Sequence, residues 1–208
     1  MLVAFIASAA SFFPALWIVV LIHEVGHARS AERLTGESEV AVRIGAPVLG
    51  RLAPTVTARL GLRRTEIYCG PFPASGYCAH AAVPGRCELA HVYAAGTRST
   101  LGAGIRSLPA TAVIAGVAAI RGSGQRFVLV TAAAVLTFTL LCFVDVFFNR
   151  VLPIGPWFPG AGPGNDGYVL RKLRDPTYTP PDVLTAAELQ KRFRRRGWPT
   201  RRRARRTL

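Results

Sequence analysis

The sequence predicts a mainly α-helical, polytopic membrane protein with about three transmembrane helices and a small β-hairpin or sheet on the cytoplasmic side. Two observations lead to this fold class. Half of the 208 residues (50%) are hydrophobic and the mean hydropathy is +0.31, which is unusual for a soluble domain. The apolar residues also gather into three runs, and a helix of about 20 apolar residues covers the ~30 Å hydrocarbon core of a bilayer.

The three runs define the expected spans. We place them at about 1–28, 101–120 and 127–149. The first run holds no charge as far as Ile22, and the third holds only Asp145. The middle run reaches the required length only if its helix starts near the beginning of its range. A cleaved signal peptide is disfavoured for the first run because a basic segment does not precede it.

Arginine dominates the charge of the chain. Lysine and arginine number 26 against 11 aspartate and glutamate, which gives a net charge of +15, and ten of the 26 lie between Lys191 and Arg206. Positive residues mark the cytoplasmic side, and here they follow the first and last spans. We therefore expect a multi-pass protein of the cell membrane with its N-terminus outside and its C-terminus cytoplasmic. The membrane core covers 1–175, and 176–208 form a basic, disordered tail.

The arginine-rich tail predicts a lipid partner rather than a nucleic acid. Each basic residue near an anionic membrane surface contributes about 1 kcal/mol of attraction. Among the arginines the only aromatic residues are Phe193 and Trp198, too few for a base-stacking platform. We expect anionic lipids to bind this tail.

The stretch at about 36–90 is polar, rich in glycine and proline, and predicted to be β-rich. Apolar residues alternate at Val40, Val42 and Ile44, the period of a strand. A second extended stretch at 65–69 runs into the proline-containing segment 72–77. Proline disfavours a central strand position, so this last segment is predicted to form an edge strand or a dipping loop.

A metal-site motif, His23-Glu24-Val25-Gly26-His27, ends the first hydrophobic run. Residues four apart lie on one face of a helix, so both imidazoles can bind one zinc ion at about 2.0 to 2.1 Å. Glu24 is placed to take a proton from a water that the zinc acidifies and to pass it to a leaving amine. A simple membrane boundary needs no such spacing and is normally formed by Lys, Arg, Trp or Tyr.

With this motif the chain resembles the site-2 protease family of membrane zinc metalloproteases, the M50 peptidases. Two further segments carry the resemblance. One is the glycine-proline hairpin that ends at Gly76-Tyr77, and the other is an Asn-x-x-x-Pro segment at 149–153 followed by Asp-Gly at 166–167. The resemblance implies one Zn²⁺ per chain with Glu24 as the catalytic residue. The implied metal ligands are His23, His27 and Asp166.

The third ligand has a rival. The family commonly places its aspartate soon after the asparagine, whereas here an insertion at 157–164 lengthens the connection. Asp145 lies one helical turn before Asn149, and either carboxylate completes three protein ligands with an open position. We favour Asp166, with Asp145 as an acceptor of a hydrogen bond from a ligand histidine or as a surface ion-pair partner of Arg150. The resemblance suggests that Asn149 donates to an oxyanion or a substrate backbone, and the alternative is that it simply ends the span.

Other ligand-type residues carry weaker signals. No cysteine pair has Cys-x-x-Cys spacing, so a thiolate zinc site is disfavoured. His80 and His91 have no partner at ligand spacing, and we take them as ordinary histidines. The four cysteines are Cys69, Cys78, Cys87 and Cys142.

Two functions remain open at the level of sequence. The first is a zinc-dependent intramembrane or juxtamembrane endopeptidase that hydrolyses membrane-anchored protein substrates, with the segment 72–77 pairing with the substrate as an added strand. The second is a non-catalytic membrane scaffold that keeps the zinc-site framework. An intact Glu24 favours the first, because a purely structural site has no use for a general base.

Overall fold

The computed structural model describes most of the chain as far as residue 180. The described residues are 2–36, 40–46, 65–69, 72–80, 83, 85–121, 126–152, 154–155 and 165–180. Residues 181–208 of the basic tail and the insertion at 157–164 lie outside them.

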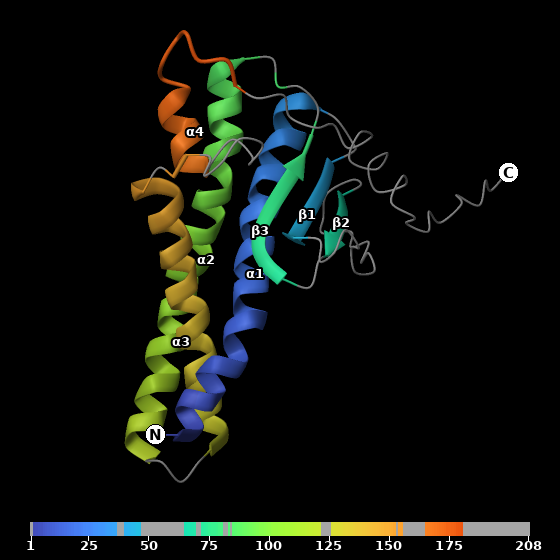
Figure 1. Ribbon diagram of the computed structural model, residues 1–208. Helices are drawn as coiled ribbons and strands as arrows, with labels where there is room; N and C mark the ends of the chain where they lie inside the picture. Colours follow the sequence, from blue (N-terminus) through green and yellow to red (C-terminus); the bar gives the residue numbers. More distant parts are fainter. Residues whose placement is uncertain are drawn as a thin grey trace, which may run out of the picture.

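Three long helices form the body of the structure. α1 (Leu2–Thr35), α2 (Arg86–Arg121) and α3 (Arg126–Val146) lie side by side, and each contacts the other two (Figure 1). The protein is therefore mainly helical, as the sequence predicts. All three helices are long and apolar enough to cross a membrane.

The second helix begins earlier than predicted. We expected a span at 101–120, but α2 begins at Arg86, inside the stretch predicted to be β-rich. The additional turns contact both α1 and α4, and Leu89, Val92 and Ala94 are buried there, Leu89 beside Val169 of α4. Polar residues alternate with these apolar ones, so mean hydropathy does not reveal the first turns of this helix.

Small and hydroxyl-bearing residues lie where the helices meet. A Cβ atom on Gly26 of α1 would lie within 2.6 Å of Ser99 Oγ and Ala95 O of α2, so only glycine permits this approach. Between α2 and α3, Thr139 Oγ1 lies 2.8 Å from Ser107 Oγ and 3.0 Å from Thr111 Oγ1. The three-helix contact is therefore close at both interfaces.

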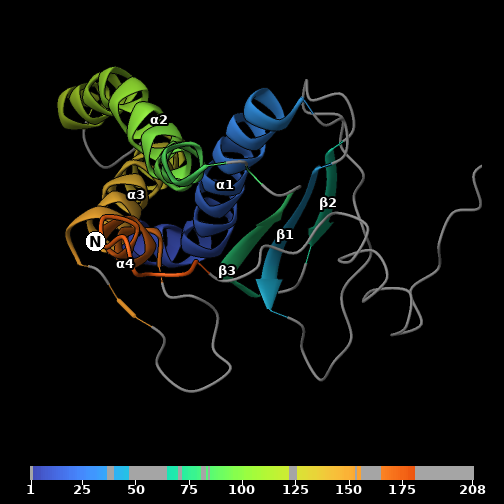
Figure 2. The same ribbon diagram turned by 90° about the horizontal axis from the view of Figure 1, so that it is seen from above.

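A small sheet packs against α1. Its strands are β1 (Val40–Ala46), β2 (Thr65–Cys69) and β3 (Phe72–Ala79), in the order β2-β1-β3. The first strand is central, parallel to β2 and antiparallel to β3, so the element is a three-stranded sheet rather than a lone hairpin. The proline-containing β3 lies at an edge, as predicted. From above, the sheet occupies the side of α1 opposite α2 and α3 (Figure 2).

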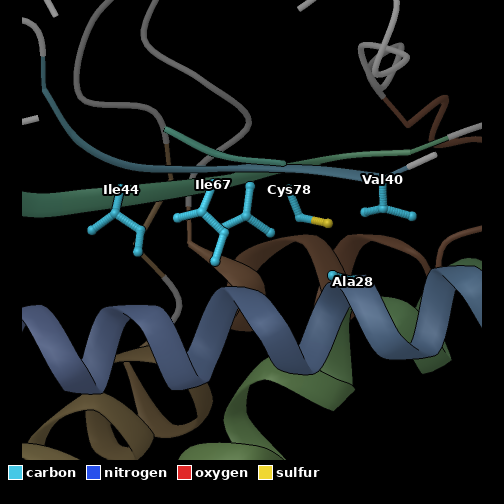
Figure 3. Packing of buried hydrophobic residues seen from close by; sticks show 6 residues of the cluster. Ala28, Val40, Ile44, Ile67 and Cys78 are labelled. Carbon is cyan, nitrogen blue, oxygen red and sulfur yellow. The ribbon is translucent and has the colours of Figure 1, made fainter. Parts of the chain in front are cut away.

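Alternating residues of the sheet build its core against the helix. Val40, Ile44, Ile67 and Cys78 point from the three strands toward Ala28 of α1 (Figure 3). The period of two in β1 buries Val40, Val42 and Ile44 on this one face. The sheet is thereby held beside the turn of α1 that carries the histidine motif.

The third helix continues into a segment that returns to the bundle. A π-helical turn, η1 (Phe147–Val151), follows α3, and α4 (Asp166–Lys172) lies beside α2 and η1. The end of the bundle that holds α4 is opposite the end that holds the N-terminus (Figure 1).

Candidate metal centre

The two histidines of the motif converge on one carboxylate oxygen. The Nε2 atom of His23 lies 2.8 Å from Asp166 Oδ2, and the Nε2 atom of His27 lies 3.1 Å from the same oxygen. The potential ligand atoms of all three residues lie within 4.8 Å of one another. The structure therefore brings together the three residues that the sequence proposes as metal ligands.

The spacing of these atoms suits a small tetrahedral ion. Ligand atoms at about 2.0 to 2.1 Å from zinc in a tetrahedral site are roughly 3.3 Å apart. The two observed nitrogen-to-oxygen distances fall a few tenths of an ångström below this, at 2.8 and 3.1 Å. All three ligand atoms lie within 4.8 Å of one another, so side-chain rotations would bring them around one ion.

The far nitrogens of both imidazoles have partners that fix the rings. His27 Nδ1 lies 2.7 Å from the carbonyl oxygen of Val92 on α2, and His23 Nδ1 lies 2.8 Å from Asp145 Oδ2 on α3. A carbonyl only accepts, so His27 donates through Nδ1–H, and a carboxylate imposes the same direction on His23. With an ion bound, both rings would be neutral and would present an Nε2 lone pair to it, the form in which histidine binds metal.

Because Gly96 has no side chain, it leaves space for the Nε2 atoms of His23 and His27. A Cβ atom at this position would lie 2.5 Å from His27 Nε2 and 2.6 Å from His23 Nε2. The backbone of α2 therefore forms one wall of the cluster, and a side chain there would occupy the volume that an ion needs. This open wall and the donor set of two imidazoles and a carboxylate both fit zinc.

Glu24 lies between α1 and the edge strand. It is 7% exposed, and a Cβ atom on Gly76 of β3 would lie 2.1 Å from its Oε1 atom. The glycine of the edge strand thus leaves room for the carboxylate to rest against the strand backbone. Glu24, the candidate general base, is thus buried and directly follows the candidate ligand His23 in the chain.

Asn165 holds Asp166 at the start of α4. Its side chain caps the helix by accepting from the backbone N–H of Tyr168. Its backbone N–H donates to Ile154 O at 2.9 Å, and its Oδ1 atom accepts from Ile154 N at 3.0 Å. These bonds join the two ends of the inserted connection, so the extra length does not move the aspartate away from the histidines.

The C-terminal end of α4 is anchored to α2. Arg86 donates from its guanidinium to the carbonyl oxygens of Leu173, Asp175 and Pro176. A cluster of Leu89, Val169 and Leu173 lies beneath these bonds. Both ends of this short helix are therefore tied to the bundle, which positions its aspartate.

Electrostatics keep Asp166 ionised. Burial alone would raise the pKa of this carboxyl, but the adjacent His27 and His23 imidazoles outweigh burial and hold the pKa well below its usual range. The carboxylate is therefore in the charged form that a metal ligand requires.

The rival carboxylate occupies a different place. Asp145 lies against the Nδ1 atom of His23 and does not join the cluster of Nε2 atoms. The geometry thus assigns it the hydrogen-bond acceptor position rather than that of a ligand. The candidate oxyanion donor Asn149 points its amide at Asp145.

Among the side chains that the structure describes, the other ligand-type residues remain outside this cluster, and Cys69 is not among these described side chains. His91 is exposed and His80 is buried at the end of β3. Cys78, Cys87 and Cys142 are free thiols, and burial raises the pKa of the Cys78 thiol, so it packs as a neutral group. Sequence reasoning missed the carbonyl of Val92 and the guanidinium of Arg86, because neither belongs to a motif.

Comparison with known proteins adds no assignment. A scan of the chain against protein-family models finds no matching family, and a search of curated proteins finds no matching relative. The resemblance to the M50 peptidases therefore depends on the motif residues of the sequence alone.

A methyl group on residue 96 tests the shape of the cluster. We expect Gly96→Ala to lower zinc affinity by at least about tenfold, because the new Cβ would lie within 2.6 Å of both Nε2 atoms. The matched control is Gly102→Ala on the same helix, where the added Cβ meets nothing within 4 Å. Zinc per chain, measured by plasma mass spectrometry, should fall in the first variant alone; equal zinc in both would contradict the proposed wall.

Proposed function

We propose that this chain is a multi-pass membrane zinc metalloendopeptidase, similar to the M50 peptidases, that hydrolyses peptide bonds of membrane-anchored protein substrates. The observation that carries the proposal is the convergence of His23 Nε2 and His27 Nε2 on Asp166 Oδ2, with Glu24 buried beside them. Two histidines, one carboxylate and an adjacent glutamate are the donor set and base of a hydrolytic zinc site with an open position.

The surface of the helices supports a membrane location. Each of the three long helices exposes large apolar side chains, whereas soluble proteins rarely expose a contiguous patch of this kind. Close contacts through glycine and hydroxyl-bearing residues are typical of helices packed within lipid. Examples of the exposed apolar residues are Phe13, Ile105, Val113, Leu136 and Leu140.

The arginines of the chain indicate on which side of the membrane the site lies. They are concentrated after the first and last spans, which favours a site toward the cytoplasmic side and an N-terminus outside. The apolar span of α1 runs from Ala9 to Thr35, so His23 lies about 21 Å along it. The proposed activity is therefore intramembrane or juxtamembrane.

Different residues would bind the metal and transfer the proton. His23, His27 and Asp166 would hold the ion, and bound zinc would acidify a water and polarise the scissile carbonyl. Glu24 accepts the proton of the attacking water and delivers it to the leaving nitrogen. The burial of Glu24 against Gly76 keeps its carboxylate in one orientation and away from bulk water.

The edge strand offers a way to bind the substrate. A peptide bond in a helix is hidden in its hydrogen-bond ladder, so a membrane-anchored substrate must become extended before water can attack it. In the described part of the chain β3 pairs with β1 alone, and its Gly76 touches Glu24. A substrate added to β3 as a further strand would pass beside the general base.

Proline substitutions test this binding mode. Ala74 and Ser75 lie between the paired residues Phe72 and Gly76, where the register of β3 with β1 shifts, and neither is a register partner of a β1 residue. A variant with proline at one of them, Ala74→Pro or Ser75→Pro, therefore removes a donor outside the paired ladder. We expect that variant to keep its zinc and to lose about tenfold in cleavage rate, the effect of one hydrogen bond. Thr65→Pro, at the start of the opposite edge strand, is the control. Unchanged cleavage in both β3 variants would remove strand addition from the mechanism.

Substitution of the general base tests the proposed reaction. Glu24→Gln should keep about one zinc per chain while hydrolysis of a denatured, fluorophore-labelled protein by detergent-purified enzyme falls by about 10² to 10⁴ fold. The control is Glu32→Gln, which lies on the same helix outside the cluster. A zinc-loaded parent with no hydrolysis would favour the scaffold function instead, and a Glu24 variant as active as the control would contradict Glu24 as the general base.

A further inference from the structure

The amide of Asn149 is fully committed to Asp145. Its Nδ2 atom donates to Asp145 Oδ1 at 2.9 Å and to the backbone oxygen of Asp145 at 3.1 Å. A side-chain amide has two N–H donors, and these two bonds use both of them. No donor of this amide is left for a substrate carbonyl.

The same carboxylate continues the chain of bonds to the metal centre. While Oδ1 of Asp145 accepts from Asn149, its Oδ2 atom lies 2.8 Å from His23 Nδ1. The opposite nitrogen of that imidazole, Nε2, faces Asp166. Asn149 of η1, Asp145 of α3 and His23 of α1 thus form a continuous chain of hydrogen bonds, and the last of them is a candidate metal ligand.

The hydroxyl of Thr100 does not take the place of Asp145 as the hydrogen-bond partner of His23. Thr100 Oγ1 lies 3.4 Å from His23 Nδ1, a long contact, and it donates its proton to Gly96 O at 3.1 Å. The short bond of the imidazole is therefore the one to Asp145. Asn149 lies in the π-helical turn, and such turns occur frequently at functional sites.

We propose that Asn149 is a positioning residue that acts through Asp145 on His23, and not a group that binds the substrate. The bond to Oδ1 holds the carboxylate in the rotamer that accepts from His23 Nδ1–H, which keeps the Nε2 lone pair aimed at the ion. The bond to the backbone oxygen of Asp145 fixes the amide itself. The inference rests on the metal centre of the proposed function but not on peptide hydrolysis.

A double-mutant cycle on zinc affinity tests the inference. Asn149→Ala and Asp145→Ala should each raise the zinc dissociation constant of detergent-purified full-length protein by about 10 to 100 fold, measured by competition with a chelator. Because Asn149 acts only through Asp145, the double variant should bind zinc no more weakly than Asp145→Ala. Thr131→Ala, which removes a side-chain bond to Phe127 O elsewhere on α3, is the control and should leave the affinity unchanged.

Two further readouts separate positioning from a general loss of structure. Asn149→Leu, close to asparagine in shape but without donors, should reproduce the affinity loss of Asn149→Ala if the alanine variant folds poorly. Both should alter the visible spectrum of the Co²⁺-substituted protein, while the thermal midpoint of the metal-free protein stays within a few degrees of the parent. An affinity and spectrum equal to the parent, with only the rate of hydrolysis lowered, would overturn the inference and return Asn149 to the substrate. A parent that binds no zinc would overturn the metal centre as well.

Discussion

The candidate metal centre depends on one contact, in which two imidazole nitrogens lie beside a single carboxylate oxygen. His23 and His27 are neighbours on one turn of α1, but Asp166 comes from a short helix far along the chain. Bringing it there requires the bundle to close around α1, the inserted connection to be tied by Asn165, and α4 to be anchored by Arg86. A local motif thus becomes a site only through the tertiary fold.

Burial makes every polar group in this region depend on a partner. An imidazole removed from water without a hydrogen bond loses several kcal/mol of solvation, roughly 2 to 7 by transfer from water. His27 finds the carbonyl of Val92, and His23 finds Asp145. Glycine at 96 and 76 replaces side chains where the rings and Glu24 need the space. The same contacts that satisfy these groups leave their metal-facing atoms free to converge.

The sequence predicted the local parts of this arrangement better than the distant ones. The four-residue spacing of His23 and His27 determines their shared face on any helix, and alternation in β1 determines which side meets the core. The choice between Asp145 and Asp166 stayed open because spacing along the chain does not say which carboxylate returns to the histidines. The role of the Val92 carbonyl depends on how closely α2 approaches α1, which leaves no motif in the sequence.

The most direct test of the metal centre is the zinc content of the detergent-purified protein and of its ligand variants after reconstitution with zinc. The account predicts about one zinc per chain, lost in the His23→Ala/His27→Ala double variant and in Asp166→Asn. Asp145→Asn should still bind zinc, because the amide oxygen can accept from His23 Nδ1–H. A parent without zinc, or a site that survives Asp166→Asn and is lost in Asp145→Asn, would contradict it.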